Sequence, residues 1–176
     1  MYMDVSIHGM KSRHVPPEER VYYELHRAAL WDRNLSASKV APMPKVLGVE
    51  SPHMEPLFRS MEELFRILIE GGKWRSVEIY MGLGDKWTPE SRSCSKGIRF
   101  PGIYVEAWSD EWEDPVSLSA RPFEPEYVKS VIESLSSGIP TELFEKIAGH
   151  VLGLYEDFRR GGYAVLVVYF SADNWS

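Results

Sequence analysis

The stretch Gly102-Ile-Tyr-Val-Glu-Ala-Trp-Ser-Asp-Glu-Trp-Glu-Asp-Pro115 decides how the rest of this sequence is interpreted. Its first half alternates apolar residues with other residues at a period of two, which predicts a strand over about 100–108. Its second half places four carboxylates in a loop. In α/β proteins, an apolar strand that delivers carboxylates to its C-terminal end is a frequent location of metal and phosphate chemistry. A half-buried strand followed by a solvated acidic turn is the alternative, and this stretch leaves both open.

Other segments also have the pattern of strands. The segment 163–170 is apolar on both faces, which is typical of a central strand. Residues 1–15 are either a short strand or a loose arm. The remaining expected strands are 45–50, 74–83 and 116–120.

Four segments have the apolar spacing of helices. We expect helices over 16 to about 31, 60–70, 125–135 and 141–160. Ser51–Pro56 is expected to be a turn, and Ser60-Met-Glu-Glu63 is expected to start the second helix as a capping box. Strands separated by helices predict an α/β (α+β) fold, with a mixed, partly parallel sheet flanked by about four helices in one domain over 1–176.

Composition excludes several classes of protein. The chain has 176 residues, which is enough for one domain with a core. No apolar run approaches the roughly 20 residues of a membrane helix, and the N-terminus lacks the features of a signal peptide. Cys94 is the single cysteine, so neither an internal disulfide nor a cysteine-based zinc site is expected. The expectation is a cytoplasmic protein that makes no membrane contact.

The charge is unevenly distributed. The net charge of −6 argues against a protein that coats nucleic acid in general. Residues 1–100 hold 15 Lys and Arg against 13 Asp and Glu, a net of +2, whereas residues 101–176 hold 5 against 13, a net of −8. The basic part of the first region, 73–99, either holds phosphates beside a metal or is a solvated loop.

The order of these segments resembles the small catalytic subunits of archaeo-eukaryotic primases. The resemblance covers about residues 16–171 as short matches that share an order. It implies a primase-like fold, and a nucleotidyltransferase that uses Mg²⁺ or Mn²⁺ and binds nucleotide or a nucleic-acid end. Arg75, Lys96, Arg99, Ser171 and Asn174 are the implied binding residues. The matching stretches are Pro17-Glu-Glu-Arg-Val-Tyr-Tyr23, Phe58-Arg-Ser-Met-Glu-Glu-Leu-Phe-Arg-Ile-Leu68, Arg75-Ser-Val-Glu-Ile-Tyr80, Lys96-Gly-Ile-Arg-Phe-Pro-Gly-Ile-Tyr-Val-Glu106, and 141–160 with Val167-Val-Tyr-Phe-Ser171.

The chain departs from the family at the metal site. The family has Asp-x-Asp where this chain has Glu106-Ala107-Trp108, and its zinc-binding cysteines are missing here. Glu106 and Asp110 are therefore the candidate catalytic and metal-binding residues. On a regular strand they lie about 13 Å apart, too far to share two ions about 3.5–4 Å apart, unless a bulge or turn at Ser109 folds Asp110 back. The resemblance thus implies a degenerate relative with reduced or no activity.

Tryptophan supports a different function. Trp87, Trp112 and Trp175 fall in polar loops, where an indole can stack on bases or fill a pocket of a partner. The alternative is therefore a non-catalytic α/β module that binds a protein partner through exposed tryptophans. The five histidines show no i, i+4 pair, so no helical metal site is expected, and His26 and His150 are expected to be structural or surface groups.

Overall fold

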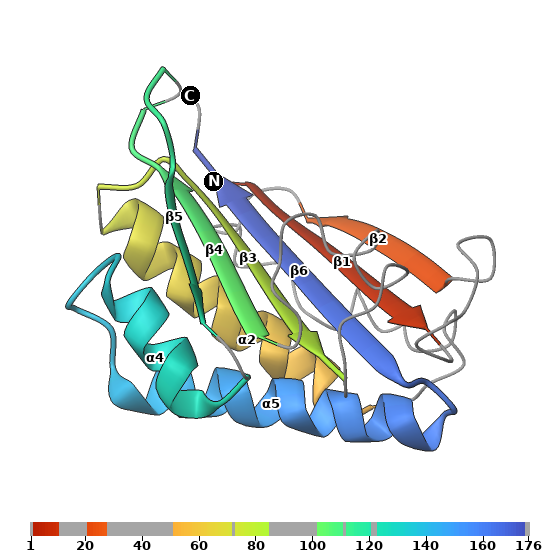
Figure 1. Cartoon of the computed structure of the whole chain (residues 1–176). Helices are drawn as coiled ribbons and strands as arrows, with labels where there is room; N and C mark the ends of the chain where they lie inside the picture. The colour runs from red at the N-terminus through yellow and green to blue at the C-terminus, as the bar shows by residue number, and fades with distance from the viewer. Residues whose placement is uncertain are drawn as a thin grey trace.

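The computed structural model describes residues 2–10, 21–27, 51–71, 73–84, 102–110, 112–120 and 123–174. Six strands form one sheet in the order β2-β1-β6-β3-β4-β5 (Figure 1). The strands are β1 Tyr2–Met10, β2 Val21–Arg27, β3 Ser76–Leu83, β4 Gly102–Trp108, β5 Val116–Ala120 and β6 Val165–Asp173. The helices are α2 Met54–Phe65, which continues as the π-helical turn η3 Arg66–Glu70, then α4 Pro125–Glu133 and α5 Thr141–Arg160.

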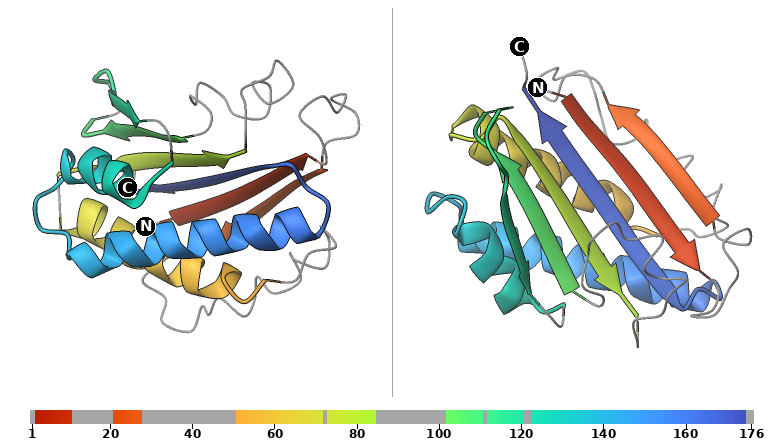
Figure 2. Two further views of the ribbon diagram at one scale, coloured as in Figure 1. Left: turned by 60° about the horizontal axis from the view of Figure 1, so that its bottom comes forward. Right: turned by 45° about the horizontal axis from the view of Figure 1, so that its top comes forward.

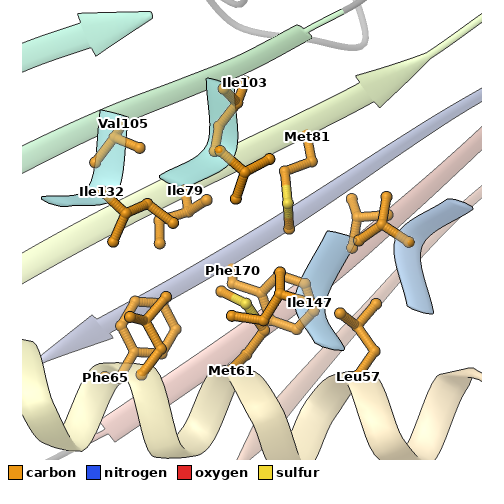
Figure 3. Close-up of a cluster of buried hydrophobic side chains, with 14 of the residues drawn as sticks. Leu57, Met61, Phe65, Ile79, Met81, Ile103, Val105, Ile132, Ile147 and Phe170 are labelled. Atoms are coloured by element: carbon orange, nitrogen blue, oxygen red, sulfur yellow. The ribbon is translucent and has the colours of Figure 1, made fainter. Parts of the chain in front are cut away.

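The described helices all cover the same face of the sheet (Figure 2). The helix α5 packs against both α2 and α4. Alternate residues of each central strand point into this interface, where apolar side chains from strands and helices form one buried cluster (Figure 3). The opposite, outer face of the sheet therefore carries the other half of the strand residues.

The mixed α and β class is confirmed, but the expected partly parallel sheet is wrong. All five pairings between the described strands are antiparallel. The prediction assumed that each strand–helix–strand connection returns a parallel strand, as in a βαβ unit. Here β5 is followed by two helices, and β6 enters between β1 and β3 antiparallel to both.

The helix expected over 16–31 is wrong for its described part, because Val21–Arg27 is the strand β2. The apolar residues of this segment fit a helical spacing, but Val-Tyr-Tyr is also strand-forming sequence. Pairing with β1, from Met3 opposite Arg27 to Gly9 opposite Val21, decides between the two. The same pairing shows that Tyr2–Met10, the described part of residues 1–15, is a strand and not a loose arm.

The second predicted helix exists but starts earlier than expected. It begins at Met54, so Ser60 lies buried inside α2 and the capping box is wrong. The prediction of a turn over Ser51–Pro56 is wrong at Pro56, because this residue lies in the first turn of α2. Proline is tolerated there because the N–H groups of the first turn have no partner within the helix.

Most of the remaining elements follow the prediction. The strands β3, β4 and β5 and the helices α4 and α5 are confirmed, and β6 is interior to the sheet as expected. The expected strand 45–50 lies outside the described residues. Among the helices that the structure describes, none is long and apolar enough to span a membrane.

Candidate functional site

Glu106 lies on the outer face of the sheet, away from the helices. Its neighbours Val105 and Ala107 are fully buried on the helical face, whereas Glu106 is half-buried. Glu106 is paired with Glu78 of β3, and Glu78 is paired in turn with Ser171 of β6. Because adjacent strands are about 4.8 Å apart, the backbones at Glu106 and Ser171 are about 10 Å apart. The structure thus brings two of the predicted residues into one row on one face.

Three tyrosines form the next row on this face. Tyr80 lies between Tyr104 and Tyr169, with ring centroids 6.0 Å and 4.5 Å away. The Tyr104 hydroxyl donates to Glu106, and the Tyr169 hydroxyl donates to Oε1 of Glu78 at 3.2 Å. Burial is the main cause of the raised pKa of all three phenols, and the nearby carboxylates raise it further. The three hydroxyls therefore stay protonated at neutral pH, and those of Tyr104 and Tyr169 donate to the carboxylates.

Sequence reasoning missed this row of tyrosines as a unit. The period of two placed Tyr80 on the same side of its strand as Glu78, and this local signal was correct. The sequence does not indicate the order of the strands. Tyr169 lies far from Tyr80 in the chain, and the two meet only because β6 pairs with β3.

Asp110 takes part in the turn that follows β4. Its Oδ1 accepts a hydrogen bond from the Trp112 N–H at 3.0 Å, and its carbonyl accepts from the Glu113 N–H at 3.3 Å. The pairing of β4 with β3 runs without a bulge as far as Trp108. The carboxylates of Glu106 and Asp110 thus serve different hydrogen bonds, one on the sheet and one in the turn. Their roles as catalytic and metal-binding residues stay predictions.

Arg75 and Asn174 meet at the end of the sheet. The Arg75 N–H donates to the carbonyl of Trp108 at 2.8 Å, and the Asn174 N–H donates to the carbonyl of Arg75 at 2.8 Å. These bonds extend the sheet by one residue beyond the paired strands. Two residues predicted to bind nucleotide are therefore adjacent, while Lys96 and Arg99 lie outside the described residues, as does Cys94.

Carboxylates and histidines gather into no metal site within the described segments. No group of three or more His, Cys, Asp or Glu side chains there is placed to hold an ion. The binding of Mg²⁺ or Mn²⁺ to this protein, which the primase resemblance implies, stays a prediction.

Large apolar side chains are exposed at the β5 side of the molecule. Trp112, in the turn between β4 and β5, is 87% exposed, Val116 on β5 is 42% exposed and Tyr127 on α4 is 38% exposed. The described residues contain one other exposed large apolar side chain, Leu152 on α5. The turn that carries Trp112 projects from one end of the sheet (Figure 1). We call Trp112, Val116 and Tyr127, with the turn and strand that connect them, the hairpin surface.

Two histidines, His53 before α2 and His150 on α5, are in contact. Because they are far apart in the sequence, an i, i+4 spacing does not reveal this pair. The Nδ1 atoms of His53 and His150 are 3.2 Å apart, so the N–H of one ring donates a hydrogen bond to the Nδ1 of the other. Burial lowers the pKa of His150, and His53 lowers it further. Beside them Asp157 accepts hydrogen bonds from Ser51, at 2.5 Å, and from Arg160. This cluster fixes the segment before α2 to the middle of α5, so the expected structural role of His150 fits its contacts.

Gly153 makes room for this contact, because a Cβ atom at position 153 would overlap the ring of His53. Gly149 lies one turn earlier on α5 with open space around it. Replacing a helical glycine with alanine stabilises a helix by about 0.8–1.0 kcal/mol. We therefore expect Gly149→Ala to stabilise the protein by about 1 kcal/mol. Gly153→Ala is expected to lose this gain, because the His53 ring must move and its hydrogen bond is worth about 0.5–1.5 kcal/mol.

Urea denaturation of the two variants, alone and combined with His53→Ala, measures this difference. The gain at position 153 is expected to reappear once the His53 ring is absent. Equal stabilisation by both alanines in the His53-containing protein would show that the ring does not occupy this space.

The chain matches no family model, no curated protein and no solved structure in the comparisons with known proteins. The resemblance to primases therefore stays a prediction.

Proposed function

We propose that this protein is a binding module that recognises a protein partner through the hairpin surface. The observation that carries the proposal is the position of the exposed apolar side chains. Three of the four that the described residues contain lie between Trp112 and Tyr127, on consecutive elements of the chain. Trp112 is the most exposed of these side chains, at 87%, and aromatic residues such as tryptophan are enriched at protein interfaces.

Trp112 is the expected anchor of this surface. Tryptophan is enriched among the residues that dominate binding energy, because its ring buries a large area and loses little conformational entropy. The turn holds the residue in place: the Trp112 N–H is bonded to Asp110, and the Ser109 hydroxyl donates to Oε2 of Glu113 at 3.0 Å. A preorganised anchor lowers the entropy cost of association.

The nucleotidyltransferase that the primase resemblance implies has less support. Its two candidate carboxylates make different hydrogen bonds: Glu106 accepts from Tyr104 on the sheet, and Asp110 accepts from the Trp112 N–H in the turn. One of the two residues that the enzyme prediction assigned to metal binding, Asp110, thus helps to position the backbone of the anchor.

Selection from a random peptide-display library against the immobilised protein tests the proposal. We expect selected peptides to bind Trp112→Ala at least about 30-fold more weakly than the wild type, which corresponds to a hot-spot contribution of about 2 kcal/mol. The thermal midpoint of Trp112→Ala should change little, because the side chain is exposed in the folded protein.

Leu152→Ala provides the matched control, since Leu152 is also exposed but lies on α5, outside the hairpin surface. Its peptide affinities are expected to equal those of the wild type. Selected peptides that bind Trp112→Ala as tightly as the wild type, or a selection that yields no binding peptide, would refute the proposal.

A further inference from the structure

The hairpin surface includes an edge of the sheet. The strand β5 is the last in the strand order and pairs with β4 from Ala107 opposite Val116 to Ile103 opposite Ala120. No described strand pairs with its other side. In an antiparallel edge strand, every second residue directs its N–H and C=O groups away from the sheet. Within the described part of the chain, this edge therefore offers backbone hydrogen bonds that another strand can complete.

The sequence of β5 lacks two features that often protect an edge, charged residues and proline. Proteins discourage edge-to-edge pairing with charged residues, proline or a bulge. The strand Val116-Ser-Leu-Ser-Ala120 contains no charged residue and no proline, and all five residues are exposed or half-buried. The strand β2 at the opposite edge of the sheet differs, because its sequence includes Glu24, His26 and Arg27.

The surroundings of this edge are acidic. The segment 109–133, which includes the turn, β5 and α4, holds 7 Asp and Glu against 2 Lys and Arg, a net of −5 in a chain of net −6. Among the described acidic residues, Asp110, Glu113 and Asp114 are exposed in the turn, and Glu124, Glu126 and Glu133 are exposed at the beginning and end of α4. The turn leads directly into β5, and α4 packs against β4 and β5, so both groups of carboxylates belong to elements that adjoin the edge strand.

We propose that an extended segment of the partner, rich in lysine and arginine, adds to β5 as a seventh strand. This inference rests on the proposed function and specifies how the hairpin surface recognises its partner. The backbone of the segment completes the hydrogen bonds of β5, as in other cases of strand addition. Its cationic side chains are attracted by the carboxylates of the turn and of α4, and an arginine can stack on the Trp112 ring. Positive charge makes the segment complementary to this edge.

The test uses three synthetic peptides of about seven residues, the length of a typical strand. The first alternates lysine with threonine, and the second has the same sequence with every backbone nitrogen methylated. The third replaces lysine with glutamate. Binding is followed by titration of tryptophan fluorescence and by amide hydrogen exchange of residues 116–120 in the full chain.

The lysine peptide is expected to bind at least about tenfold more tightly than the methylated peptide, because methylation removes the backbone donors and retains the charge. It should also slow the exchange of β5 amides by at least about tenfold, a protection that neither control peptide provides. The glutamate peptide is expected not to bind.

Three results would overturn the inference in different ways. Equal binding of the lysine and methylated peptides, with loss of both in Trp112→Ala, would leave the hairpin surface as a binding site but exclude strand addition. A dissociation constant of the lysine peptide above about 1 mM would exclude the basic strand as the ligand, and the display selection would still judge the proposed function separately. Protection of β5 that grows with protein concentration without peptide, together with a dimer in light scattering, would show that a second copy of the chain occupies the edge.

Discussion

Replacing Phe170 with alanine is expected to destabilise the protein by about 3–5 kcal/mol, a large part of the 5–15 kcal/mol that stabilises a typical domain. Phe170 is fully buried on the interior strand β6, and its ring meets the edge of the Phe58 ring of α2 at a centroid distance of 5.7 Å. Truncation therefore leaves a cavity between the sheet and the helical layer (Figure 3). The midpoint and slope of urea denaturation measure the loss.

Phe170→Leu keeps a large apolar side chain at the same position and is expected to cost less than half as much. Leu152→Ala, at an exposed position of α5, should change stability by no more than about 0.5 kcal/mol. If Phe170→Ala lost less than about 1 kcal/mol, the packing of β6 against α2 described above would be wrong.

Trp74→Ala is expected to have an effect of similar size, about 3–5 kcal/mol. Trp74 is 6% exposed and lies directly before β3. Its Nε1–H donates to the carbonyl of Leu135, just after α4, at 2.9 Å. The side chain thus joins two parts of the molecule, and alanine would remove both the ring and the hydrogen bond. Thermal and urea unfolding followed by circular dichroism are suitable measurements, because this variant lacks a buried tryptophan signal.

Trp74→Phe separates the two contributions. Phenylalanine keeps most of the apolar ring but cannot donate, so the expected loss is about 1–3 kcal/mol, the cost of a buried carbonyl without its partner. A Phe variant as unstable as the Ala variant would mean that the hydrogen bond, and not the packing, dominates at this position.

Local sequence patterns correctly predicted the elements whose apolar residues fit either a helical or a strand period, but not both. The helix α5 keeps its apolar residues in step over 20 residues and ends at Arg159-Arg160 before two glycines, and both its existence and its end are confirmed. The strands β3 and β4 alternate clearly and are also confirmed. The helix predicted for the segment that forms β2 was wrong, because the apolar residues of this segment fit both a helical and a strand period. Pairing with β1 decides in favour of the strand.

The candidate site was less predictable, because its contacts depend on the order of the strands and the packing of the helices. Sequence reasoning placed Trp112 in a polar loop, and the structure confirms that location. It could not show that α4 packs against β4 and β5, since these contacts depend on tertiary structure. The contact between His53 and His150 joins residues 97 positions apart, far beyond any pattern that a local window detects.

The pairing of the first described strand with the last determines when this protein can fold during synthesis. Nine consecutive pairs join β1 to β6, from Tyr2 opposite Asp173 to Met10 opposite Val165, and β6 also pairs with β3. Until a ribosome has released the residues of β6, the β1–β2 hairpin and the three strands from β3 to β5 are separate pieces without their common neighbour. Such contacts between distant residues slow folding and prolong the exposure of unpaired strands to aggregation. The nascent chain therefore depends on β6 to join the two halves of the described sheet.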